Sequence, residues 1–123
     1  MTFLTVFYVL NATLILLHEI ESGYEKEWEI LKLPGKITGF LLLHIPIILV
    51  IFYGLLEIDK LTPIGLILGI ITGFGGLIPF LIHKKIYKRE RQFNLKISNT
   101  LIYSNIITGI ITVLYSFYYL LTP

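Results

Sequence analysis

The sequence predicts an all-α integral membrane protein, built as a bundle of four transmembrane helices. Hydrophobic residues make up 55% of the 123 positions, and the mean hydropathy of +0.82 is too apolar for a soluble domain of this length. Four windows reach the roughly 20 mostly apolar residues that a membrane-crossing helix needs. Short connectors join them, so we expect one domain that covers residues 1–123.

The four predicted spans are about residues 3–20, 37–56, 61–82 and 100–121. The first lacks the basic segment and small-residue cleavage site of a secretory signal, and we interpret it as a retained helix. A charged loop ending in Pro34-Gly35 follows the first span and a tight turn follows the second. The third connector is basic, and we expect it to be amphipathic. Because the loops are short, neighbouring spans are expected to run antiparallel.

Basic residues predict the orientation of the bundle. Nine of the ten Lys and Arg residues lie in the first and third connectors, and Lys60 alone lies in the second. The positive-inside rule therefore places the first and third connectors in the cytoplasm and both termini outside. The basic cluster of the third connector is expected to contact anionic lipid headgroups. A net charge of +2 gives no argument for a nucleic-acid partner.

Small residues in the third span predict its packing. Gly65, Gly69 and Gly73 recur at four-residue spacing, which lets a neighbouring backbone approach closely in lipid. The Gly75-Gly76 pair and Pro79 follow, and they indicate either continued packing or a hinge or substrate groove. Amides such as Asn11 and Asn105 are expected to form hydrogen bonds between helices, and we place Asn105 nearest to the candidate site.

Histidines and carboxylates within or beside a span are costly in lipid and are therefore functional candidates. His18, His44 and His83 all fall toward the predicted cytoplasmic side. If the first helix continues beyond its apolar window, Glu21 and Glu25 share the face of His18, at i+3 and i+7. His44 lies about 11 Å below the start of the second span, at 1.5 Å per residue.

This set of residues predicts one polar pocket between the first two helices. Since the chain has no cysteine, the candidate ligands are imidazole and carboxylate, which suit zinc or non-haem iron. Without a metal, the same groups form a general acid and base pair. The predicted catalytic residues are His18, Glu21 and His44, and the predicted metal ligands are His18, Glu21, Glu25, His44 and His83. In the alternative interpretation the carboxylates form a solvated face and the histidines make interhelical hydrogen bonds.

Two segments carry a family resemblance. The run LHEIESGYEKEW at residues 17–28, followed by LLLHIP at residues 41–46, resembles small uncharacterised bacterial four-helix membrane proteins with an HE-x-[DE] motif, an EW pair and a second-helix histidine. The first segment is also similar, more loosely, to the HXXEE membrane proteins. Ser22 stands where that motif ends in glutamate, which leaves Glu25 or Glu27 as a substitute. The resemblance implies a multi-pass protein of the bacterial inner membrane and no defined reaction.

These observations predict a small membrane enzyme, metal-dependent or acid–base, that acts on a lipid-like molecule. The comparison with four-helix sterol isomerases rests on fold alone. The alternatives are a module that binds or transports a metal ion or a proton, and an accessory subunit without chemistry. The expected partners are membrane lipid, a lipid-like small molecule or a metal ion, and a second copy of the chain in a homo-oligomer.

Overall fold

The computed structural model describes residues 1–86 and 95–122, and this part of the chain contains helices and no strand. Four segments are long and apolar enough to cross a membrane: Phe3–Tyr24, Lys36–Asp59, Pro63–His83 and Lys96–Leu121. The predicted all-α bundle of four membrane-crossing helices is therefore confirmed. The first helix runs four residues beyond its predicted end, and the last begins four residues before its predicted start. Residues 87–94 of the predicted basic connector lie outside the described residues.

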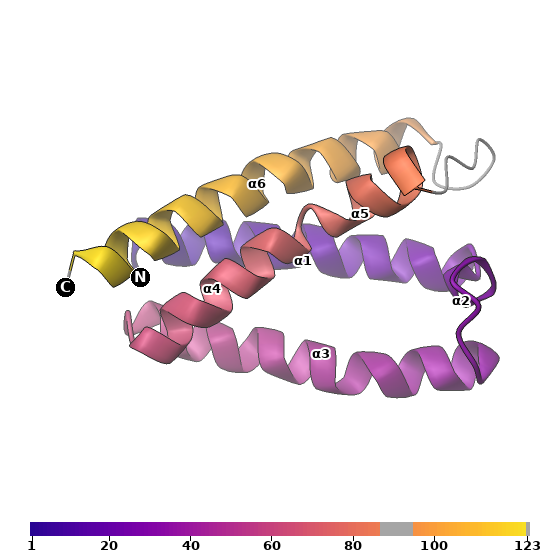
Figure 1. The fold of residues 1–123 in the computed structure, drawn as a ribbon, viewed down its shortest axis with the longest axis horizontal. Coiled ribbons are helices and arrows are strands. Elements are labelled where there is room, and N and C mark those ends of the chain that lie inside the picture. Colours follow the sequence, from indigo (N-terminus) through magenta and orange to yellow (C-terminus); the bar gives the residue numbers. More distant parts are fainter. Residues whose placement is uncertain (87–94, 123) are drawn as a thin grey trace.

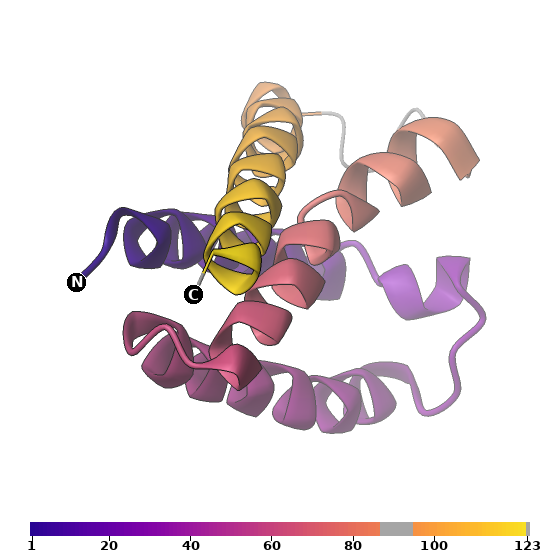
Figure 2. The same ribbon diagram turned by 60° about the vertical axis from the view of Figure 1, so that its left-hand side comes forward.

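The chain runs up and down through the bundle (Figure 1). The elements are α1 (Phe3–Tyr24), α2 (Glu27–Ile30), α3 (Lys36–Asp59), α4 (Pro63–Gly75), α5 (Ile78–Phe80), a π-helical turn η1 (Leu81–Ile86) and α6 (Lys96–Leu121). Both termini and the turn between α3 and α4 lie at one end of the molecule, and α2 lies at the other. Seen after a 60° turn, α4 passes between α6 and α3 (Figure 2).

Polar contacts tie α1 to α3 at the end that holds the termini. Thr2 caps α1 by accepting a hydrogen bond from the backbone N–H of Thr5 at 3.1 Å. The Thr5 hydroxyl donates to Asp59 at 3.0 Å, and the buried Tyr8 hydroxyl donates to the carbonyl of Ile51 at 2.7 Å. These two hydrogen bonds join residues that are far apart in the sequence. They align the start of α1 with the end of α3, so the two helices lie antiparallel.

The glycine stripe packs α4 against α3 and α6, as its spacing predicts. A Cβ on Gly69 would lie 2.7 Å from Ile58 Cδ1 of α3 and would also clash with Ser116 Oγ of α6. A Cβ on Gly73 would lie 2.8 Å from the carbonyl oxygen of Gly109. These distances are too short for any larger side chain, so the glycines allow the backbones of α4 and α6 to touch.

Asn11 is the polar junction of the bundle and has no exposed surface. Its amide donates to the carbonyl of Thr72 in α4 at 2.9 Å, and its oxygen accepts from Thr108 of α6 at 2.9 Å. The interhelical role predicted for Asn11 is therefore confirmed. Asn105 is also buried and lies beside Gly76, near this junction.

The third span is broken close to its middle. Helix α4 ends at Gly75 and α5 begins at Ile78. Pro79 lacks the N–H that a continuous helix needs four residues after Gly75. After the break, α5 packs against α6, so this half of the span diverges from α3 (Figure 1). The packing role of the glycines before the break is therefore confirmed, whereas a hinge or substrate groove at Gly75, Gly76 and Pro79 stays a prediction.

Two matched alanine substitutions test the packing role. We expect Gly73→Ala to lower the free energy of unfolding by about 1–3 kcal/mol, because the new methyl group meets a backbone carbonyl that cannot move alone. Gly75→Ala should be neutral or slightly stabilising, since its Cβ meets only Ile15 Cδ1, at an ordinary 3.6 Å. Unfolding in detergent micelles measures both. Equal stability of the two variants would show that α4 and α6 do not touch at Gly73.

Candidate metal centre

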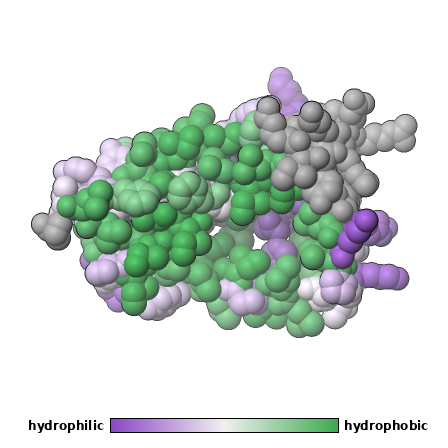
Figure 3. All heavy atoms as spheres, in the orientation of Figure 1, coloured by the Kyte–Doolittle hydropathy of each residue, from purple (hydrophilic) through white to green (hydrophobic). Residues whose placement is uncertain are grey.

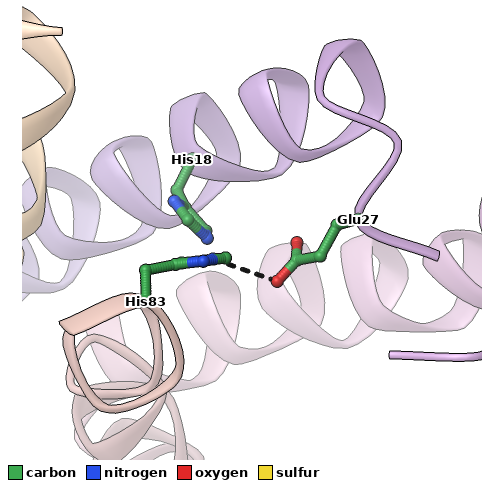
Figure 4. Close-up of side chains that lie close together, drawn as sticks. All are labelled: His18, Glu27 and His83. Carbon is green, nitrogen blue, oxygen red and sulfur yellow. Dashed lines mark ion pairs between the residues drawn. The ribbon is translucent and has the colours of Figure 1, made fainter. Parts of the chain in front are cut away.

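Three buried side chains from three separate segments meet at the α2 end of the bundle (Figure 4). They are His18 of α1, Glu27 of α2 and His83 of η1, with exposed fractions of 6%, 5% and 6%. One ligand atom of each lies within 4.8 Å of the others. His83 Nε2 lies 3.1 Å from Glu27 Oε1, and the two imidazole ring centres are 5.0 Å apart. We call this group the His18–Glu27–His83 triad.

A reversal of the chain places Glu27. Helix α1 continues through Ser22 and Gly23 to Tyr24, and the N–H of Glu25 donates to the carbonyl of Glu21 at 2.8 Å. Lys26 then adopts the left-handed backbone conformation, with φ 53°. This conformation cannot continue a right-handed helix, so the chain reverses its direction after α1. Glu27 follows at once as the first residue of α2, and its side chain points toward His18 (Figure 4).

Trp28 holds this turn against the bundle. Its side chain is 7% exposed, and its ring lies 5.6 Å from that of Phe40 in α3, between ring centres. A buried indole contributes a large apolar contact. Helix α2 has four residues and needs such an anchor, because an isolated helix this short is unstable. The EW pair of the sequence thus supplies the carboxylate and the anchor next to it.

His83 comes from the π-helical turn that ends the third span. Such turns are rare and are frequent at functional sites. The break between α4 and α5 directs the chain toward α6, and η1 then presents His83 inward to His18 and Glu27 (Figure 4). The position of His83 therefore depends on two irregular features of the same span.

The charge of Glu27 is stabilised by its neighbours. Burial by itself would raise the pKa of the Glu27 carboxyl. The pKa nevertheless lies below its usual value, because His83 and the Ser22 hydroxyl favour the carboxylate and His83 and His18 add positive potential. Glu27 is thus an anion beside two imidazoles, which is the state in which a carboxylate binds a metal.

A second pair lies nearby and joins α1 to α3. His44 Nε2 lies 2.5 Å from Glu19 Oε2, and His44 Nδ1 lies 2.7 Å from the carbonyl oxygen of Phe40. The His44 side chain is 12% exposed and that of Glu19 is 27% exposed. Glu19 also interacts electrostatically with Glu27 and His83. The Glu19–His44 pair is therefore an electrostatic neighbour of the triad.

The structure groups the predicted site residues differently from the sequence analysis. His18 and His83 lie together, but the group of three ligands among the described residues does not include Glu21, Glu25 or His44. Helical periodicity placed Glu21 and Glu25 on the face of His18, whereas α1 ends at Tyr24, so that Glu25 lies beyond it. The carboxylate of the triad comes instead from Glu27, one of the two substitutes that the motif allows.

Glu19 is the functional candidate that sequence reasoning missed. It follows His18 directly, so it points to a different side of α1, and no periodic pattern connects it with His44. The signal was the antiparallel pairing of the first two helices, which predicts that some carboxylate of α1 lies beside His44 at similar depth. The face of α1 that meets α3 was not evident from its sequence, because apolar residues occur on every side of the helix.

The triad has the composition of a metal site that keeps a position open for substrate. Two histidines and one glutamate form a catalytic zinc ligand set and also the facial ligand set of non-haem iron. At zinc–ligand distances near 2 Å, ligands in a tetrahedral site lie about 3.4 Å apart. The Glu27–His83 pair, at 3.1 Å, already meets this distance, and the other pairs, within 4.8 Å, would have to close by at most about 1.4 Å.

Comparison with known proteins assigns the chain to a family and to no activity. No curated protein and no solved structure matches the chain significantly. A family model matches residues 4–119, which include every residue of the triad and all but the outermost residues of the four spans. The chain therefore belongs to the family of unknown function DUF6713.

Proposed function

We propose that this protein is a membrane-embedded, metal-dependent enzyme whose His18–Glu27–His83 triad binds one zinc or ferrous ion. The observation that carries the proposal is the convergence of three buried ligand atoms within 4.8 Å. We propose a lipid-like substrate, because the triad lies at one end of four membrane-crossing helices and the face of the bundle drawn in Figure 3 is mostly apolar.

The burial of the triad supports a bound cation. Glu27 and both imidazoles are almost fully withdrawn from solvent, and an ionised carboxylate in such a place is costly unless it is paired and hydrogen-bonded. A divalent cation compensates the anion and takes a lone pair from each neutral imidazole. Three protein ligands leave at least one coordination position free, and a bound water at that position becomes acidic enough to act near neutral pH.

The distribution of charge supports a cytoplasmic position for the site. The end of the bundle that holds α2 also holds η1 and the start of α6, and the segments at this end contain six of the seven Lys and Arg residues that the structure describes. The positive-inside rule places this end in the cytoplasm, as proposed for a protein of the bacterial inner membrane. The ion would then reach the triad from the cytoplasm, and the substrate would reach it from the bilayer.

The loose similarity of residues 17–28 to the HXXEE membrane proteins stays a prediction.

Substitution of the triad tests metal binding. Protein purified in detergent without chelator should carry about one zinc or iron per chain, and Glu27→Gln should weaken the metal affinity at least tenfold, because the amide has no negative charge and is a poor ligand. Elemental analysis and competition with a chromophoric chelator measure this. Glu21→Gln is the matched control, since Glu21 lies outside the triad, and it should keep the metal.

The same comparison discriminates the metal centre from a purely structural cluster. In a structural cluster, Glu27→Gln destabilises the fold and the parent protein contains no metal. Folded parent protein that stays free of zinc and iron after equilibration with either ion would refute the proposal. Equal metal loss in Glu21→Gln and Glu27→Gln would move the site away from Glu27.

Metal removal should lower the thermal stability. A ligand that binds the folded state raises the free energy of unfolding by about 2.7 kcal/mol when present at a hundredfold excess over its dissociation constant. We therefore expect a chelator to lower the unfolding temperature of the parent protein and to leave that of His83→Ala unchanged. A thermal scan in detergent with and without chelator measures the difference. An unaltered parent protein would contradict metal binding to the folded state.

Cysteine labelling tests the orientation. Because the chain has no cysteine, single replacements can be labelled without background. Glu29→Cys, in α2, should react with a membrane-impermeant maleimide only after the cells are opened. Lys60→Cys, in the exposed turn before α4, should react in intact cells. The reverse pattern would place the triad on the outer side of the membrane.

A further inference from the structure

We propose that the substrate of this site is an uncharged long-chain lipid alcohol, whose chain occupies the cleft between α1, α3 and the α4–α5 span and whose hydroxyl is held by Glu19, the member of the Glu19–His44 pair that lines this cleft. The inference rests on the proposed function, since it assigns a substrate class to the same site. It uses residues outside the metal triad.

The cleft is an apolar cavity of about 400 Å³ that opens toward the lipid. The divergence of α5 from α3 creates it, and its walls include Ile15 of α1, Pro46 and Val50 of α3, Ile71 and Gly75 of α4 and Pro79 of α5. Figure 3 shows the surface hollowed between α3 and the α4–α5 span, with a hydrophobic rim. Since its rim residues Val50 and Ile71 are exposed on a membrane-spanning face, the occupant of the cleft comes from the bilayer.

Glu19 gives the cleft a polar end. It is the single carboxylate among the described residues that line the cavity, and Thr72 is the other polar residue there. Glu19 also lines a second apolar groove of about 420 Å³ together with His44, on the other side of the contact between α1 and α3. Glu19 therefore borders both grooves and can contact a small polar group in the cleft, whereas His44 lines the second groove and orients Glu19 from there.

The geometry of the pair indicates its protons. The carbonyl of Phe40 can only accept, so Nδ1 of His44 carries a proton. Nε2 and the Glu19 oxygen lie 2.5 Å apart, and two lone pairs at this distance would repel, so they share one further proton. The pair can thus accept a hydrogen bond through the outer Glu19 oxygen. A hydroxyl group supplies that donor.

The depth of the pair selects an uncharged head. Glu19 lies five residues before the end of α1 and His44 lies eight residues after the start of α3, which corresponds to about 8 and 12 Å at 1.5 Å per residue. A phosphate or carboxylate in this position would lose its hydration and would meet the outer Glu19 oxygen, which accepts hydrogen bonds and cannot compensate a negative charge. A hydroxyl requires no charge compensation. Glu19 follows His18 directly in α1, so the cleft that Glu19 lines is next to the triad in the sequence of α1.

Photolabelling with a matched pair of probes tests the inference. The parent protein is placed in phosphatidylcholine nanodiscs at slightly alkaline pH and illuminated with a long-chain alcohol that carries a diazirine at mid-chain, or with the carboxylic acid of the same chain. Mass spectrometry maps the labelled residues. We expect the alcohol to label the cleft walls roughly tenfold or more above the acid, because a charged head is disfavoured at this depth.

Two matched substitutions at Gly75 test the position of the chain. Gly75→Leu should reduce labelling of the cleft several-fold, because its side chain extends into the cavity. Gly75→Ala should keep it, since its Cβ meets only Ile15 Cδ1, at 3.6 Å. Glu19→Gln keeps the shape and replaces one accepting carboxylate oxygen with a donating amide, and it should reduce the preference for the alcohol over the acid. The inference would be overturned if Gly75→Leu left the labelling of the cleft unchanged. It would also be overturned if the acid labelled the cleft to the same extent as the alcohol.

Metal content is measured in the same samples. The results therefore test the metal centre and the lipid-alcohol site independently of each other. Normal zinc or iron content without labelling of the cleft overturns the substrate class and leaves the metal centre. Alcohol-selective labelling of the cleft in a chain that binds no metal overturns the metal centre and supports the lipid site. Thermal unfolding of each variant shows whether it is folded. If Glu19→Gln does not fold, the comparison of Gly75→Leu with Gly75→Ala still tests the inference.

Discussion

The close approach of α4 to α1 and α6 is the contact on which the rest of the structure depends. Helices in lipid gain little from burying apolar side chains against one another, so association requires short backbone distances and interhelical hydrogen bonds. Gly73 and Gly109 supply the first, because a Cβ on either would meet the carbonyl of the other. Asn11 supplies the second by bonding to both α4 and α6. Tight packing in this part of the bundle leaves α3 as the peripheral helix.

The cleft follows from this arrangement. Helix α3 packs against α4 near their connecting turn, where Gly65 allows the two backbones to meet. Beyond the break at Gly76 and Leu77, α5 packs on α6 instead. A straight third span would have stayed beside α3 and filled the space. The same break redirects the chain before η1, which presents His83 to α1, so the break contributes both to the cavity and to the His18–Glu27–His83 triad.

The ionisable residues are arranged as partners, as an apolar medium requires. An unpaired charge is expensive in lipid, and each buried histidine of α1, α3 and η1 lies against a carboxylate or another imidazole. The triad and the Glu19–His44 pair are adjacent, yet they differ in surroundings. The triad is closed from solvent and suits an ion, whereas the pair borders two apolar grooves and suits the polar end of a lipid.

Sequence alone determined the class, number and approximate limits of the spans, because apolar length is the direct requirement of the bilayer. It also determined the packing role of the glycine stripe and named His18, His44 and His83 as candidates. Tertiary structure decided their partners. Helical periodicity cannot predict the left-handed turn at Lys26 that returns Glu27 to His18, nor the π-helical turn that carries His83. The rotation of α1 toward α3, which pairs Glu19 with His44, depends on side-chain packing between helices, and an almost uniformly apolar helix carries no local pattern that specifies it.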